Sequence, residues 1–177
     1  MSKRAEILQL ANLELQQKGV ASLSFRELAA KLGIKSSSVH YYFAQKDDLI
    51  EALIDDYSKQ TLQAANASTQ SLRPGKERLL ALVDLIHDKL QNRQCTAGIL
   101  AAESAQISER ARAAISAFFN QLEQWLINEL KAAGKKPAEA QVLARVILTS
   151  VEGSLMIGSV DADESYLQNL RKFIAGL

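Results

Sequence analysis

Apolar residues recur at helical spacing along almost the whole chain. Between Lys3 and Lys18 the positions Ile7, Leu8, Ala11 and Leu15 fall on one face, and Gly19 follows as the expected stop. Similar patterns predict helices at about 24–32, 36–42, 46–62, 75–92, 95–105, 108–133, 137–159 and 163–176. The polar stretch 63–71 is expected to be frayed helix and loop. The pattern predicts an all-α fold of about nine helices.

Capping and turn residues mark several of the expected helix ends. Ser24 and Glu27 have the spacing of a capping box, in which each side chain accepts from the backbone amide of the other. Ser108 is expected to cap the long helix that ends at Gly134. Pro74 and Pro137 are each expected in a first helical turn, where a missing amide hydrogen costs nothing.

Residues 25–44 predict two short helices joined by a tight turn at Gly33, which tolerates a left-handed backbone. Ala29 is small enough for the second helix to cross close above it. Five apolar positions would hold the two helices together: Leu28, Leu32, Ile34, Val39 and Tyr42. This is the helix-turn-helix arrangement. Its second helix would expose polar side chains able to hydrogen-bond to bases or phosphates.

The formal net charge of +1 conceals an asymmetry along the chain. Residues 1–46 hold seven Lys or Arg and three acids, a net charge of +4, so residues 47–177 carry −3. A basic head on a slightly acidic body is typical of a nucleic-acid reader with a second function, although charge also fluctuates by a few units by chance. We therefore expect a DNA-binding domain at 1–46 and a ligand-binding and dimerisation domain at 47–177.

Several motifs in the first 50 residues resemble the amino-terminal signature of TetR-family transcriptional regulators. They are the segment 19–29, the pair Gly33-Ile34, the run Val39-His40-Tyr41-Tyr42-Phe43 and the segment 46–49. The resemblance implies a homodimer with a three-helix DNA-binding head and a six-helix ligand-binding body. Such a protein usually represses transcription and leaves its operator, a double-stranded DNA, when a small-molecule effector binds.

The resemblance also implies roles for particular residues. Ser24 would offer its hydroxyl or its helix-start amide to a phosphate, Tyr42 would contact phosphate through its hydroxyl, and Lys46 would bind the opposite backbone. The expected DNA-contacting set is Ser24, Arg26, Lys35, Ser36, Ser37, Ser38, His40, Tyr41, Tyr42 and Lys46. Family members usually have Ser or Thr where Lys35 stands, so Ser36 is expected to cap the recognition helix instead. They often have Tyr in place of His40, whose imidazole would make binding sensitive to pH.

No arrangement of residues predicts an enzyme, a metal site or a cofactor. His40 and His87 are far apart, the single Cys95 excludes an internal disulfide and a cysteine-built zinc site, and no phosphate-cradling glycine loop occurs. No apolar run approaches the ~20 residues that a bilayer helix needs. The basic amino terminus is followed by polar residues rather than by a signal-peptide core. A cytoplasmic protein without a membrane partner is expected.

Apolar and aromatic residues of the body are candidates for the walls of a ligand pocket, although for any single residue ordinary core is the stronger explanation. The candidates are Leu82, Ile86, Cys95, Ile99, Phe118, Phe119, Leu122, Trp125 and Met156. Glu103 and Glu152 are candidates for a polar contact to a ligand, and also for solvated positions.

Cys95 allows a second hypothesis about function. A helix amino terminus and the neighbouring Arg93 both favour the reactive thiolate, whereas a buried thiol would be inert. The alternative to a DNA-binding repressor is therefore a helical sensor or interaction protein without DNA binding, responsive to electrophiles or redox state through Cys95.

The helix after Pro137 is apolar over a wide arc. Its apolar residues are Val142, Leu143, Val146, Ile147, Val151, Leu155 and Ile157, interrupted by Gly153, Ser154, Gly158 and Ser159. Such a helix suits a two-fold interface, in which it and the last helix pair with their mates as a four-helix bundle. In a dimer the two recognition helices must lie about 34–36 Å apart to enter successive major grooves. A ligand that tilts the helix beginning at Lys46 would change that separation.

Overall fold

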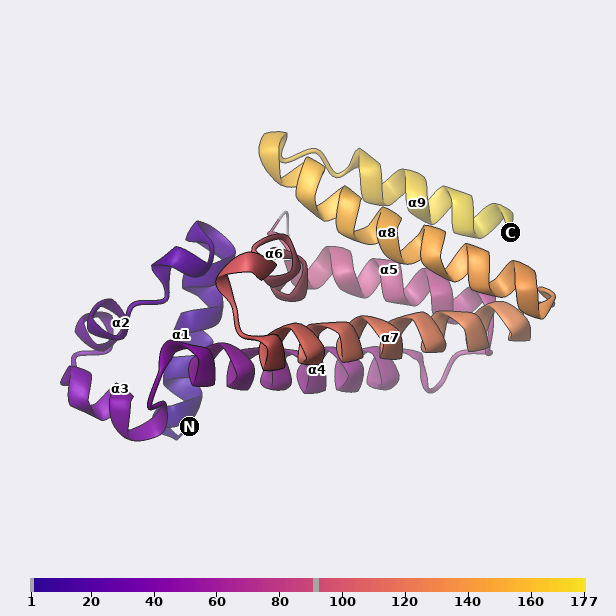
Figure 1. The fold of residues 1–177 in the computed structure, drawn as a ribbon. Coiled ribbons are helices and arrows are strands. Elements are labelled where there is room, and N and C mark those ends of the chain that lie inside the picture. Colours follow the sequence, from indigo (N-terminus) through magenta and orange to yellow (C-terminus); the bar gives the residue numbers. More distant parts are fainter. Residues whose placement is uncertain (1, 91–92) are drawn as a thin grey trace. The chain divides into compact units, whose positions relative to one another are not determined.

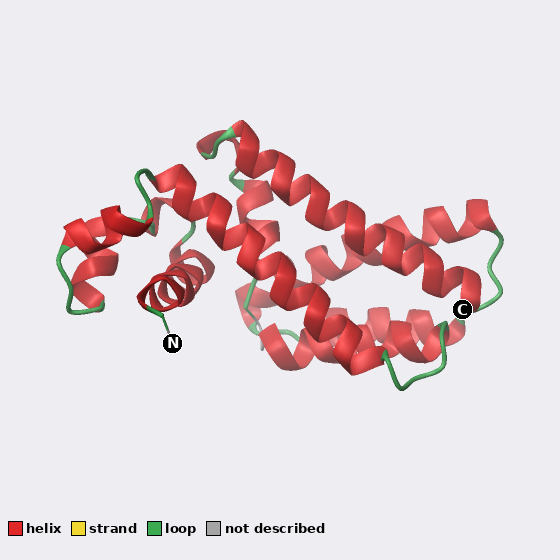
Figure 2. Cartoon of the chain, turned by 90° about the horizontal axis from the view of Figure 1, so that it is seen from below, coloured by secondary structure: helices red, strands yellow, loops and turns green. Residues whose placement is uncertain are grey.

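The computed structural model describes residues 2–90 and 93–177, and all regular elements within these ranges are helical (Figures 1 and 2). The elements are α1 (Lys3–Lys18), η1 (Val20–Ser22, a 3₁₀ turn), α2 (Phe25–Lys31), α3 (Ser36–Tyr42), α4 (Lys46–Thr69), α5 (Lys76–Leu90), α6 (Thr96–Ala102), η2 (Ser104–Gln106, a 3₁₀ turn), α7 (Glu109–Ala132), α8 (Pro137–Asp161) and α9 (Ser165–Gly176). The predicted all-α fold with nine helices is confirmed for the described part of the chain. Residues 91 and 92 of the helix predicted at 75–92 lie outside it.

The chain divides into two compact units. The first unit comprises Met1–Lys59 and Thr96–Ala117, and the second comprises Gln60–Cys95 and Phe118–Leu177. Helices α4 and α7 contribute residues to both units. The domain boundary after Lys46 stays a prediction about function, because these units are defined by packing alone.

The first unit is built around one apolar core. Helix α1 packs against η1, α2 and α6, and α2 packs against α3. Five side chains from these helices and α4 are fully buried: Ile7, Leu15, Leu28, Val39 and Leu49. The apolar stripe predicted for α1 is therefore the face that holds the first unit together.

Several predicted helix ends are confirmed. Gly19 ends α1 with φ +74°, and Gly33 takes φ +65° in the turn before α3. Residues with a side chain rarely adopt this backbone region. The Ser108 hydroxyl accepts from the amide of Ala111 at 3.1 Å and caps α7. Pro137 occupies the first turn of α8.

Two boundaries in the second unit differ from the prediction. Helix α4 continues through the stretch expected to fray and ends at Thr69. Ala65 and Thr69, one turn apart, are both buried, and the Thr69 hydroxyl donates to the Ala65 carbonyl at 2.8 Å. Small residues thus form the buried face of this turn, and a pattern of large apolar residues does not reveal such a face. Pro74 lies in the turn before α5 rather than within its first turn.

In the second unit α5 packs against α9, and α9 packs against α8. Buried residues on all three helices form its core, among them Leu79, Val83, Ile147, Leu170 and Ile174. Helix α8 also has apolar residues that the chain leaves exposed, namely Val142, Val146, Met156, Ile157 and Val160. By length and composition alone α8 is long and apolar enough to cross a membrane.

Candidate nucleic-acid interface

Helix α3 is fixed by its neighbours and exposes most of its polar side chains. Val39 is fully buried, and the Ile34 amide donates to the Ala29 carbonyl at 3.0 Å across the turn. Ala29 is itself buried, as its expected close crossing with α3 requires. The local sequence thus holds a seven-residue helix that would be unstable alone.

The outer face of α3 carries hydrogen-bonding groups. Its predicted contact residues divide into exposed ones (Lys35, Ser37, His40, Tyr41 and Tyr42) and half-buried ones (Ser36 and Ser38). Tyr41 is 83% exposed, and its ring meets the Tyr42 ring edge to face at 5.0 Å. The structure therefore brings the predicted recognition residues together on one short helix. Their role in DNA contact stays a prediction.

His40 is held from α2. Its ring lies 4.8 Å from the ring of Phe25, edge to face, while its side chain stays exposed. An aromatic contact of this kind restricts how the imidazole can turn. Arg26, next to Phe25, is also exposed.

Both predicted caps in the head are wrong in detail. Ser24 occupies the N-cap position of α2, but its side chain makes no capping hydrogen bond. The Ser24 amide donates to the Ser22 carbonyl at 2.8 Å, so it is not available to the Glu27 carboxylate of a capping box. At α3 the N-cap residue is Lys35, whose carbonyl accepts from Ser38 at 2.9 Å, and Ser36 is the first helical residue.

Lys46 begins α4 and is half-buried. Its ammonium donates to the Val20 carbonyl at 2.6 Å. An ammonium has three N–H donors, so this bond leaves two for another acceptor. Lys46, which is predicted to bind a DNA phosphate, is therefore held in place by the backbone of the first unit.

The sequence prediction missed an ion pair between α1 and α2 in which the carboxylate is buried and the lysine is exposed. Glu14 is only 6% exposed, and its carboxylate accepts from Lys31 of α2 and from Lys18 of α1 at 3.3 Å. The hydrogen bond from Lys31 is the main reason why the pKa of Glu14 lies below its ordinary value of 4.5, with burial opposing. The available signal was an acidic residue beside Leu15 on the apolar face of α1.

We expect Lys31→Met to destabilise the protein by about 1–2 kcal/mol at pH 7, because it leaves a buried carboxylate with one partner fewer. A depressed pKa stabilises the folded state above the ordinary value, and this stabilisation is lost as pH falls below it. The difference from the wild type should therefore shrink towards pH 4 in urea denaturation. Lys59→Met, which removes an exposed pair with Asp55, is the control and should change stability by less than about 0.5 kcal/mol. An equal loss at both pH values would contradict this role of Glu14.

The candidate ligand-pocket residues are distributed over both units. Leu82, Cys95, Ile99 and Phe118 are buried, whereas Ile86, Phe119, Leu122 and Trp125 are half-buried. Met156 is 49% exposed on α8. Ile99 belongs to the first unit and the other eight to the second. A ligand-binding role for these nine stays a prediction.

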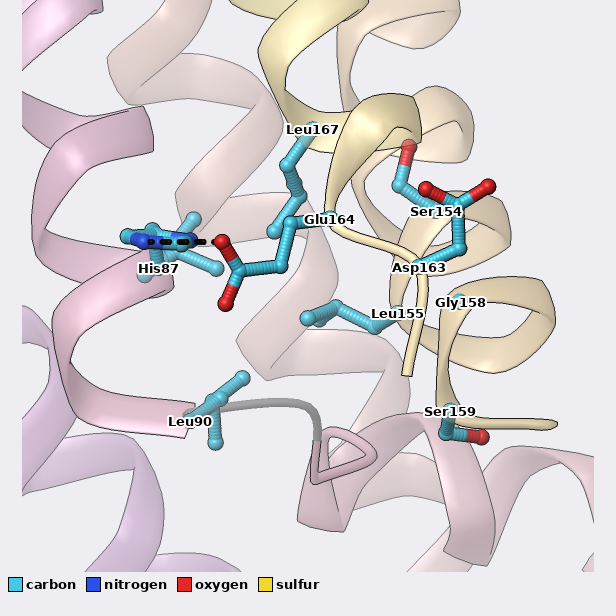
Figure 3. Close-up of a pocket in the computed structure, with 10 residues that line it drawn as sticks. His87, Leu90, Ser154, Leu155, Gly158, Ser159, Asp163, Glu164 and Leu167 are labelled. Atoms are coloured by element: carbon cyan, nitrogen blue, oxygen red, sulfur yellow. Dashed lines mark ion pairs between the residues drawn. The ribbon is translucent and has the colours of Figure 1, made fainter. Parts of the chain in front are cut away.

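One pocket of the second unit lies where α5, the end of α8 and the start of α9 meet (Figure 3). Ile86 of the candidate set lines it, with His87, Leu155 and Leu167. His87 Nε2 lies 3.8 Å from a Glu164 carboxylate oxygen, an ion pair when the imidazole is protonated. The volume of this pocket is only about 10 Å³, far below the range of about 300–1,000 Å³ usual for ligand sites.

Cys95 is buried, and its side chain hydrogen-bonds to the Glu152 carboxylate of α8. Burial raises the pKa of Glu152 above its ordinary value of 4.5, and the bond with Cys95 partly opposes this. The structure therefore buries the Cys95 thiol and places Glu152 against it rather than in solvent.

The fold and the exposed second helix of the helix-turn-helix define a DNA-binding regulator. Residues 7–53 match the family described as bacterial regulatory proteins, tetR family. Residues 76–173, more than half of the chain, match the C-terminal domain described as transcriptional regulator LmrA/YxaF-like. The chain belongs to the TetR family of transcriptional regulators. As a member of this family it regulates transcription by binding DNA and is not an enzyme.

Individual relatives agree with this assignment. The chain is 27% identical over 161 residues to the nucleoid occlusion factor SlmA of Vibrio campbellii, covering 87% of this chain and 82% of that protein. It is 36% identical over 103 residues to the probable HTH-type transcriptional regulator YttP of Bacillus subtilis, covering 54% and 48%. A TetR transcriptional regulator from Legionella pneumophila has the same fold with a TM-score of 0.94, 26% identity and coverage of 99% and 97%.

Proposed function

We propose that the protein is a homodimeric repressor that a small-molecule effector releases from a palindromic operator in the cytoplasm. One observation carries the proposal. The same chain combines an exposed recognition helix in the first unit with an exposed apolar groove in the second. A symmetric dimer would use the groove to pair its subunits and the helix to read two half-sites.

The proposed DNA contacts divide into two kinds. Exposed side chains of α3, namely Ser37, His40 and Tyr41, would reach base edges in the major groove. Arg26, Tyr42, Lys46 and the start of α2 at Ser24 would contact phosphates, which fix the position of the head on the duplex.

The groove between α8 and α9 is the proposed subunit interface. One stripe of α8 exposes Val142, Val146, Ile157 and Val160, with Ser150 and Gly153 between them. Tyr166 and Phe173 of α9 line the groove, whose volume is about 420 Å³. The opposite stripe of α8, from Ala140 to Gly158, is buried in the second unit. A second copy of the chain would cover the exposed stripe, and its small residues permit close approach of the helices.

Effector release would use the helices shared by the two units. Residues 46–59 of α4 lie in the first unit with α3, and residues 60–69 lie in the second unit. A ligand that moves the second part of α4 therefore also moves the first part. The alternative of a sensor without DNA binding is not supported, because the chain belongs to a DNA-binding family and Cys95 is a buried hydrogen-bond donor.

Selection of duplexes from random DNA by the purified full-length protein tests this proposal. We expect an enriched inverted repeat with half-site centres about one helical turn apart and two chains per duplex by native mass spectrometry. Small molecules extracted from the purified protein should raise the Kd for the selected duplex about 5–150-fold if one of them is the effector. An asymmetric site occupied by one chain would contradict the dimeric repressor.

A further inference from the structure

Both backbone polar groups of Val20 are bound by side chains from other elements of the first unit. Val20 begins η1, the turn between α1 and α2. Its amide donates to the carboxylate of Glu103, at 3.3 Å from Oε1 and 3.2 Å from Oε2. Its carbonyl accepts from the Lys46 ammonium at 2.6 Å. Glu103 and Lys46 are thus connected through one buried residue, and we call this set the Glu103–Val20–Lys46 chain.

The Glu103 carboxylate is closely fitted at its end of this chain. Glu103 follows α6 directly, and the side-chain amide of Gln106 donates through Nε2 to its Oε2 at 3.1 Å. A Cβ on Gly19 would overlap Oε1 of Glu103, so the glycine leaves the space that the carboxylate occupies. Gly19 also has φ +74°, a conformation that favours glycine. The η1 turn therefore has a specific acceptor for its first amide.

At the other end, the Val20 carbonyl restricts Lys46. A lysine side chain has four rotatable bonds, and ordering a mobile lysine side chain at an interface costs entropy that opposes binding. The bond to Val20 orders the Lys46 ammonium before any ligand arrives, with two donors left for a phosphate. The position of Val20 consequently determines where the ammonium is held.

We infer that Glu103 is a positioning residue for phosphate binding by Lys46 and acts through the backbone of Val20. The inference rests on the proposed contact between Lys46 and DNA. Without Glu103 the Val20 amide loses its acceptor, and the Val20 carbonyl is then held only by the bond within the turn from the Leu23 amide at 3.2 Å. The Lys46 ammonium is no longer placed where a phosphate lies, so its contact with DNA is lost. We expect a loss of about tenfold in DNA affinity for each subunit.

The direction in which DNA affinity changes when Glu103 is removed distinguishes a positioning role from a simple effect of charge. Glu103 is an acid in a DNA-binding unit, so removing its charge should by itself strengthen binding to a polyanion. The Glu103–Val20–Lys46 chain requires the opposite, because losing the acceptor weakens the Lys46 contact. Glu109, an exposed acid at the start of α7, provides a matched loss of charge outside this chain of bonds.

The test measures the Kd of full-length variants for the duplex that the wild type selects, over a range of salt concentrations. Glu103→Ala should weaken DNA binding and make its salt dependence shallower, each by as much as Lys46→Met does. The double variant should lose no more DNA affinity than either single variant. Glu103→Gln keeps an acceptor but loses the charge, so it should bind as tightly as the wild type or more tightly. Glu109→Ala should bind as tightly as the wild type or more tightly. A purely structural role for Glu103 would lower the melting temperature and leave the salt dependence of the folded protein unchanged.

Glu103→Asp keeps the charge but withdraws the acceptor from Val20, so it should show the same loss and replaces Glu103→Ala if that variant does not fold. Unchanged affinity and salt dependence in Glu103→Ala or Glu103→Asp, with Lys46→Met impaired, would overturn the positioning role alone. If Lys46→Met is also unchanged, the proposed phosphate contact fails together with the positioning role.

Discussion

Replacing Ile157 by glutamate is expected to give a monomer that no longer holds a palindromic operator. Ile157 is 52% exposed in the single chain and lines the groove that a second copy is proposed to cover. A carboxylate buried there without a partner costs about 3–5 kcal/mol, and a symmetric dimer contains two of them. The dimer dissociation constant should rise at least about 100-fold, measured by analytical ultracentrifugation.

Gln141→Glu is the matched control for this prediction. It adds the same charge to α8 at an exposed position, one residue before Val142 and outside the residues that line the groove. This variant should remain dimeric and bind the operator like the wild type. A dimeric Ile157→Glu protein with normal operator affinity would show that the α8–α9 groove is not the subunit interface.

Lys46→Met is expected to weaken binding to all DNA sequences rather than to one operator. A charge-assisted hydrogen bond contributes about 1.5–3 kcal/mol, so two subunits together should lose about 3 kcal/mol or more, roughly 100-fold in Kd. Each lost phosphate contact should also reduce the slope of log K against log salt by about one. Fluorescence anisotropy with selected and scrambled duplexes measures both quantities.

Lys59→Met removes the same charge from the same helix. Residue 59 lies thirteen positions beyond Lys46, about 20 Å along α4 and farther than the Debye length of about 8 Å at physiological salt. The salt dependence of this control should equal that of the wild type. If both variants lose the same amount, binding responds to net charge and Lys46 makes no specific contact.

The fold was largely predictable because most helices carry a continuous apolar face. Leu49, Ile50, Leu53 and Ile54 of α4 repeat at helical spacing, and all four are buried. The end of α4 lacked this signal, since Ala65 and Thr69 pack through small size rather than through hydrophobicity. Side-chain volume at a contact depends on the partner helix, which one chain segment does not specify.

The recognition helix was predictable from local residues, whereas the polar bonds that support it were not. Gly33, Val39 and the exposed positions of α3 follow from short-range spacing. The bond between Glu103 and Val20 joins residues 83 positions apart, and the pair of Glu14 with Lys31 spans 17. Even the local capping box at Ser24 was not formed, because the Ser24 amide donates to the Ser22 carbonyl instead of the Glu27 carboxylate. Which of two acceptors binds one amide depends on the local backbone geometry, which residue types do not reveal.

The ratio of two dissociation constants tests the central claim most directly. The full-length protein is titrated with its selected duplex and with a scrambled duplex of equal length and composition at one physiological salt concentration. A sequence-specific repressor should bind the selected duplex at least about 1,000-fold more tightly. Equal affinities for the two duplexes would contradict the account.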